Sequence, residues 1–264
     1  MTPDAEGNLH VTIFRNFLTV QESALTETDD LLKEKYKGTV QSGPFKGMKL
    51  DCGTAWRDGN ACTKLVGSYE FELHAAIEKA IDREPNFIIN VGCAEGYYAI
   101  GLGHRLPYAA VHAMDMDDKA LEQCAKNGMN NGIIGMTLVH GKVGPEDLSR
   151  GGDNRLYVVD IEGYELSVLD PQRCPELLIS DIIVECHDFF YVGENESPTS
   201  IISDSLTERF RETHEIERIE PQAPCLGDYP CLSGLVLGKA LLAITEKRPF
   251  PTAWLACWAK ERRI

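Results

Sequence analysis

The stretch NFIINVGCAEGYYAI, residues 86–100, decides the fold of this 264-residue chain. An apolar run over 87–91 meets a glycine turn, and the residues after Gly96 return to an apolar pattern that suits a helix. A strand, a tight loop and a helix in this order form the first unit of a doubly wound α/β sheet. Such sheets bind ligands at the carboxyl ends of their strands, so the loop over 92–96 is the first candidate for a binding site.

The loop departs from the pattern of a dinucleotide site, which is Gly-x-Gly-x-x-Gly. Counting from Gly92, the second and third glycine positions hold Ala94 and Tyr97, and Glu95 precedes Gly96. A carboxylate here would repel a pyrophosphate and tolerate a cationic ligand. S-adenosylmethionine (SAM) has a sulfonium and an ammonium and no phosphate, and the segment resembles motif I of the class I SAM-dependent methyltransferases. The competing interpretation is an ordinary strand–helix turn that binds nothing.

Composition indicates a globular chain with 43% apolar residues and no continuous apolar run long enough for a membrane span. The net charge of −15, with a basic cluster only at 260–263, disfavours nucleic acid as a partner and favours a small-molecule acceptor or a basic peptide. Nine cysteines form an odd number without a Cys-x-x-Cys pair, which favours free thiols in the cytoplasm. The acidic first residues do not resemble a signal peptide.

The chain divides into an N-terminal extension over 1–65 and a SAM-dependent methyltransferase domain over 66–264. The extension is expected to hold a helix over 20–36, a small hairpin over 39–50 and a loop over 51–63, and it is a candidate homodimer surface. A helix with apolar residues up to Ile81 should precede the first strand. Its amino end, with Tyr69 and Glu70, would reach the cofactor, although capping of the helix explains the carboxylate equally well.

Further strands are expected over 109–114, 136–140, 156–159, 180–188, 215–219 and 253–258, and helices over 119–128 and 201–211. Asp115 follows the second strand, 23 residues after Gly92, where an acidic residue can accept both hydroxyls of a ribose. Met116 beside it and Lys142 in the loop after the third strand are expected to lie at the adenine.

Two later segments end in paired ionisable residues. Asp160 and Glu162 follow one apolar run, and Glu185 and His187 end the next. Residues i and i+2 of a strand point to the same face, so neighbouring strands would bring these four groups to one rim of the sheet.

The segment DIEGYE over 160–165, the Gly-Tyr-Tyr end of motif I and the run VECH over 184–187 together resemble the FkbM-type methyltransferases. The resemblance covers roughly residues 86–190. It implies a Rossmann-like, seven-stranded, mostly parallel sheet with one antiparallel strand and helices on both faces. It also implies SAM as methyl donor and a hydroxyl-bearing small molecule as acceptor.

Methyl transfer requires an acceptor held about 3 Å from the methyl group and a group that removes its proton. The candidate catalytic residues are Asp160, Glu162, Glu185 and His187, with Glu162 or His187 as the base, the latter because its reference pKa lies near neutrality. The candidate cofactor contacts are Tyr69, Glu70, Gly92, Cys93, Ala94, Glu95, Gly96, Tyr97, Asp115, Met116, Lys142 and Asp160.

Three alternatives stay open. The same rim could hold a divalent metal ion, although no metal site is predicted. The reaction could be N- or C-methylation of a peptide or protein side chain, or the chain could bind SAM without turnover. An NAD-dependent oxidoreductase is disfavoured by the loop pattern. The proline-rich loop over 221–233 is expected to cover the substrate pocket.

Overall fold

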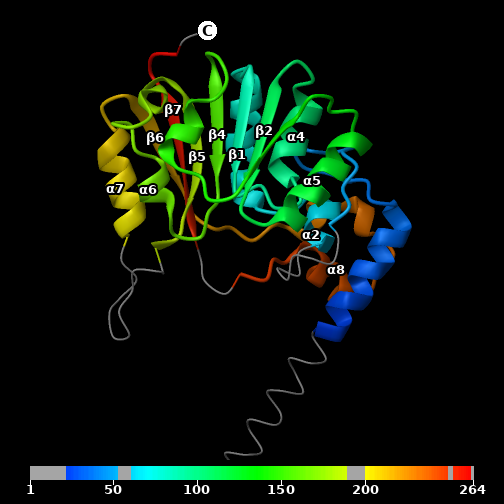
Figure 1. Cartoon of the computed structure of the whole chain (residues 1–264). Coiled ribbons are helices and arrows are strands. Elements are labelled where there is room, and N and C mark those ends of the chain that lie inside the picture. The colour runs from blue at the N-terminus through cyan, green and yellow to red at the C-terminus, as the bar shows by residue number, and fades with distance from the viewer. Residues whose placement is uncertain (1–21, 53–60, 189–199, 249–251, 263–264) are drawn as a thin grey trace, which may run out of the picture.

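The computed structural model describes residues 22–52, 61–188, 200–248 and 252–262. Its centre is a seven-stranded sheet with the order β3-β2-β1-β4-β5-β7-β6 (Figure 1). The strands are β1 Phe87–Val91, β2 Ala110–Asp115, β3 Thr137–His140, β4 Arg155–Val159, β5 Asp181–Cys186, β6 His214–Ile219 and β7 Ala253–Ala259. Only the pairings that involve β7 are antiparallel. The predicted mostly parallel α/β sheet is therefore confirmed.

Alternation along the central strand explains why both faces of the sheet are covered. In β1, Ile88 packs into one apolar cluster, whereas Ile89 and Val91 pack into the cluster on the opposite face. The first cluster includes side chains of α3 His74–Asp82, α4 Tyr97–Arg105 and α5 Asp118–Asn130. The second includes side chains of α6 Glu165–Val168 and α7 Ile201–Phe210. The same alternation buries Asn90, whose amide donates to the Val158 carbonyl and accepts from the Ala99 N–H.

A third apolar cluster joins residues between 25 and 66 with residues between 226 and 244. A helix over residues 22–36 packs with α2 Ala61–Val66 and α8 Leu237–Ile244, and it lies beside α8 in Figure 1. The predicted hairpin over 39–50 has one antiparallel bridge, Thr39 to Lys49. The predicted loop over 51–63 is wrong at its end, because residues 61–63 begin α2; the rest of it from residue 53 lies outside the described residues.

Short 3₁₀ turns complete the order of elements: η1 Phe71–Leu73, η2 Pro145–Ser149, η3 Pro175–Ile179, η5 Leu226–Asp228 and η6 Pro230–Leu232. The helix expected to end near Ile81 is α3, and it begins later than predicted. Gly67, with φ +84°, ends the preceding helix α2, and η1 lies between α2 and α3. Within the described part of the chain, every helix is too short or too polar to cross a bilayer.

Candidate functional site

A cavity of about 710 Å³ opens at the carboxyl ends of β1, β2, β4 and β5. Its wall includes the loop after β1, the end of β2, the loop after β3 and the ends of β4 and β5. This is the edge where the winding of the sheet reverses, because β1 lies between β2 and β4. Eleven predicted residues line the cavity: Tyr69, Glu70, Gly92, Ala94, Asp115, Met116, Lys142, Asp160, Glu162, Glu185 and His187.

The loop after β1 is held against β4 and β2 by its backbone. Gly92 has φ +76°, and a Cβ atom at this position would lie 1.7 Å from the Asp160 carbonyl oxygen. The Ala94 N–H donates to Asp115 Oδ2 at 2.9 Å. Glycine at position 92 therefore lets the loop approach the end of β4, and Asp115 fixes the loop from the other side.

Asp115 lines the cavity, and both of its carboxylate oxygens accept backbone hydrogen bonds. Its second oxygen, Oδ1, accepts from the Asp117 N–H at 2.9 Å. Each carboxylate oxygen has two acceptor sites, so each can accept a further hydrogen bond from a ligand in the cavity. Met116 is 79% exposed beside it, and the Lys142 ammonium lies 4.6 Å from the ring centroid of Tyr164. The predicted adenine end of the cavity is thus open and flanked by an aromatic ring.

Glu95 does not face the cavity, and the electrostatic argument made from this residue is wrong. Its side chain is fully buried and forms a 2.7 Å ion pair with Lys64 of α2. The charge of this carboxylate is therefore balanced inside the protein and is not presented to a ligand. Carboxylates that do line the cavity are Glu70, Asp115, Asp117, Asp160, Glu162, Glu185 and Glu246.

Three other predicted cofactor contacts lie behind the loop rather than in the cavity wall. Cys93 is buried and lies close enough to Cys124 for a thiol–thiol hydrogen bond. This hydrogen bond is the larger cause of the raised pKa of Cys93, and burial adds to it. Gly96 precedes the first residue of α4. The Tyr97 ring is buried against Phe45 and Tyr69. These residues support the shape of the loop, and none of the three lines the cavity, which corrects the prediction that they contact the cofactor.

The wall opposite the loop is made by residues far apart in the sequence. Glu70 is buried, with φ +46°, and its N–H donates to Glu246. Arg248 lies 2.9 Å from a carboxylate oxygen of Glu72 and 3.4 Å from one of Glu70. Burial raises the pKa of Glu70, the charge of Glu185 adds to this, and Arg248 opposes it. The residues from 246 to 248 were missed in the sequence, where the only signal is a run of charges before the last strand.

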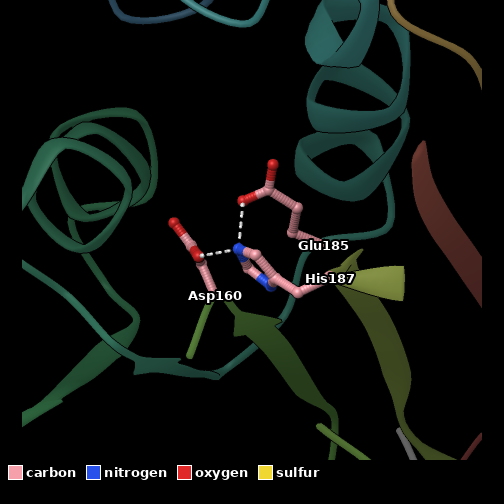
Figure 2. A group of neighbouring side chains, drawn as sticks. All are labelled: Asp160, Glu185 and His187. Atoms are coloured by element: carbon pink, nitrogen blue, oxygen red, sulfur yellow. Dashed lines mark ion pairs between the residues drawn. The ribbon is translucent and has the colours of Figure 1, made fainter. Parts of the chain in front are cut away.

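The four predicted catalytic side chains do meet at one point. His187 Nε2 lies 3.6 Å from Asp160 Oδ1, 3.5 Å from Glu162 Oε2 and 3.5 Å from Glu185 Oε2. Figure 2 shows Asp160 and Glu185 on two sides of the same ring nitrogen. His187 and Glu185 are buried, whereas the Glu162 side chain is 73% exposed. The cluster thus combines two buried side chains, Glu185 and His187, with the exposed carboxylate of Glu162 at the cavity.

A residue that the sequence did not single out fixes the histidine ring. Glu165, fully buried at the start of α6, lies with Oε1 2.6 Å from His187 Nδ1 and accepts from the Gly163 N–H at 3.0 Å. Its spacing from Glu162, three residues along a turn, was the signal that could have revealed it.

The pKa of His187 departs from the near-neutral reference value that made this residue a candidate base. Burial alone would lower its pKa, but the hydrogen bond with Glu165 and the charges of Glu185 and Asp160 outweigh burial and raise it to about 9. Burial also raises the pKa of Asp160 well above its usual range, and the neighbouring Glu185 adds to this effect.

The loop over 221–233 does not cover this cavity. It forms η5 and η6, and its Tyr229 and Leu232 pack in the third apolar cluster with the 22–36 helix. Among the described residues that line the cavity, the C-terminal part of the chain contributes Glu246, Lys247, Arg248 and Thr252 instead. The role in covering the pocket was assigned to the wrong segment.

No family model matches the sequence, and no curated protein matches it. Solved structures are similar to the chain in fold. An O-methyltransferase from Bacillus cereus in complex with SAH is 11% identical, with a TM-score of 0.47 over 90% of this chain and 91% of that chain. The O-methyltransferase TomG from Streptomyces achromogenes, in complex with SAM, is 13% identical, with a TM-score of 0.45 over 89% of both chains.

A precorrin-6y C5,15-methyltransferase from Geobacter metallireducens GS-15 is also 13% identical, with a TM-score of 0.47 over 71% of this chain and 89% of that chain. Likeness at this level concerns the general fold, and the narrower resemblance to FkbM-type enzymes stays a prediction.

Proposed function

We propose that this chain is a SAM-dependent methyltransferase that methylates a hydroxyl group of a small molecule. The observation that carries the proposal is that one cavity is lined both by the loop after β1 with Asp115 and by the Asp160–Glu162–Glu185–His187 cluster. A cofactor at the loop would direct its reactive group toward the cluster. Donor and acceptor would then share one enclosed volume, as transfer between them requires.

The residues at the cofactor end suit the parts of SAM. Asp115 would accept from both ribose hydroxyls, with the exposed Met116 and Lys142 beside the adenine. Gly92 and Ala94 would offer backbone contacts to the methionine part. Tyr69 and Glu70 lie across the cavity, where a carboxylate would suit the ammonium of SAM. The surplus of carboxylates in the wall disfavours a pyrophosphate, which preserves the choice of SAM over NAD although Glu95 takes no part.

At the acceptor end, Asp160 would lie beside the methyl group, because its backbone follows β4 and contacts the Gly92 loop. Glu162 is the most exposed of the four cluster side chains and would receive the proton of an acceptor hydroxyl. Glu185 and His187 lie deeper and would orient the acceptor. An acceptor nitrogen in place of oxygen is the alternative, and the acidic wall would suit a cationic amine.

Calorimetric titration of the full chain with SAM, with its demethylated product SAH and with NAD tests the cofactor assignment. We expect SAM and SAH to bind and NAD not to bind. Asp115→Ala should weaken SAM binding at least 10-fold, because it removes the ribose acceptors and an anchor of the loop. Asp118→Ala is the matched control, since Asp118 lies at the exposed start of α5, outside the cavity, and it should bind SAM as the wild type does. NAD binding without SAM binding would refute the proposal.

A further inference from the structure

The carboxylate oxygens around His187 Nε2 lie farther from it than hydrogen-bond partners usually do, at distances slightly longer than those between adjacent ligands of one metal ion. The three carboxylate oxygens lie 3.5–3.6 Å from Nε2, whereas N–H···O hydrogen bonds are about 2.7–3.2 Å long. Two ligands held about 2.1 Å from one ion are separated by about 3.0–3.4 Å when adjacent. Ligand atoms of Asp160, Glu185 and His187 all lie within 4.8 Å of one another.

The direction of the histidine ring is set from outside this group. Glu165 contacts Nδ1 of His187 at 2.6 Å. This contact turns Nε2 of His187 toward Asp160 and Glu185, and Figure 2 shows these two carboxylates beside the ring. Histidines that bind metal ions characteristically donate their second ring N–H to a carboxylate in this way. Glu185 is oriented independently, because its Oε1 accepts from the Thr252 hydroxyl. Both buried donors are thus fixed by neighbours that are not themselves ligands.

Charge balance points to the same kind of ligand. Two mostly buried groups, Glu185 and His187, face the carboxylates of Asp160 and Glu162, so negative charge exceeds positive charge in a volume partly removed from water. Like charges in such a volume repel strongly unless a cation lies between them. Lys64 and Arg248, which also line the cavity, are engaged by Glu95 and by Glu72.

We propose that Asp160, Glu185 and His187 bind a divalent metal ion at the acceptor end of the cavity. A donor set that includes an imidazole nitrogen favours a first-row ion such as Mn²⁺ or Zn²⁺ over Mg²⁺, which prefers oxygen ligands alone. The role of the ion rests on the function proposed above. The ion would hold the acceptor hydroxyl and lower its pKa, and Glu162 would receive the proton. The metal site itself stands on the geometry of this cluster.

Binding of Mn²⁺ to the full chain, after removal of metal with EDTA, can be followed by the loss of the electron paramagnetic resonance signal of free Mn²⁺. Mn²⁺ is a better probe than Zn²⁺, which also binds exposed thiols such as Cys225. We expect one site in the wild type. Glu185→Gln and the positioning variant Glu165→Gln should each weaken binding about 10–100-fold. Asp117→Asn is the control, because it removes a carboxylate from another part of the same cavity.

An absence of Mn²⁺ binding by the folded wild type, or equal affinity in the wild type and Glu185→Gln, would overturn the proposal. Circular dichroism identifies any variant that does not fold, and the wild-type titration decides the matter without the variants. Titration of the same samples with SAM separates the two proposals. SAM binding by a chain that takes up no Mn²⁺ refutes only the metal site, whereas Mn²⁺ binding without SAM binding refutes only the cofactor assignment.

Discussion

Close backbone contact at Gly92 connects the two ends of the proposed site. The carbonyl of Asp160 occupies the space that a side chain at position 92 would need, and the Asp160 N–H donates to the Val91 carbonyl. The loop on the cofactor side and the first residue of the catalytic cluster are therefore positioned by one another. A disturbance at residue 92 should reach both.

Gly92→Ala is expected to destabilise the chain and to remove SAM binding, because the added Cβ would clash with backbone that cannot move away without separating β1 from β4. Gly132→Ala is the matched control: Gly132 has φ +71°, and a Cβ there meets nothing within 4 Å. It should lower the free energy of unfolding by only about 1 kcal/mol, the usual strain of a left-handed alanine, and keep SAM affinity. Urea denaturation and SAM titration measure both. Equal effects of the two variants would contradict the account.

At the scale of elements, the sequence predicted the strands well because buried strands carry local signals. β4 and β5 contain the apolar runs 156–159 and 182–184, and an acidic residue, Asp160 or Glu185, follows each run directly, which is visible in the sequence of each segment alone. Interactions between distant segments could not be seen. No residue close to Glu95 in the sequence indicates that Lys64 will neutralise it, and the position of Glu165 three residues after Glu162 does not indicate that its partner will be His187. Four catalytic candidates were brought together correctly, whereas Cys93, Glu95, Gly96 and Tyr97 were displaced from the cavity by packing.

Substitutions in the helix over 22–36 test whether the predicted N-terminal extension unfolds together with the rest of the chain. Leu32 is fully buried in the cluster shared with α2 and α8, whereas its neighbour Leu31 is 38% exposed. Leu32→Ala should lower the free energy of unfolding by about 2–5 kcal/mol, through lost burial and the cavity left behind. Leu31→Ala should cost much less. Urea denaturation followed by circular dichroism and tryptophan fluorescence should give coincident curves. An unchanged main transition in Leu32→Ala would mean that the extension unfolds separately.

Across the whole molecule, several histidines take up protons less readily in the folded chain than in the unfolded one. Burial lowers the pKa of His74, His112 and His214. His214 is the most enclosed of these, with Nε2 2.9 Å from the Ser180 carbonyl oxygen. A histidine with a lowered folded pKa leaves the unfolded chain binding more protons below pH about 6.5, so its effect is to reduce stability as the pH falls.

His214→Gln removes this proton-binding group while the glutamine amide can still donate to Ser180. When the pH is lowered from 7.5 to 5, the free energy of unfolding of the variant should therefore fall less than that of the wild type. If the free energy of unfolding of both chains rises instead, that of the variant should rise more. Buried carboxylates with raised pKa, such as Glu70, act in the opposite direction in both chains, so the prediction concerns the difference between two curves. Urea denaturation at several pH values measures it. Parallel curves for the two chains would show that His214 titrates alike in both states.

The reversed direction of β7 has a consequence for how this protein could diversify. Because β7 runs against β5, with Ala253 opposite Cys186, the chain must return to the carboxyl edge of the sheet before its last strand begins. A parallel seventh strand would start at the opposite edge of the sheet, and the cavity wall would then lack Glu246, Arg248 and Thr252. The wall made by Glu246, Arg248 and Thr252 is thus encoded apart from Asp115 and the loop after β1. Exchanging the short segment before β7 would change which acceptors bind, while Asp115 and the loop after β1 stay as they are.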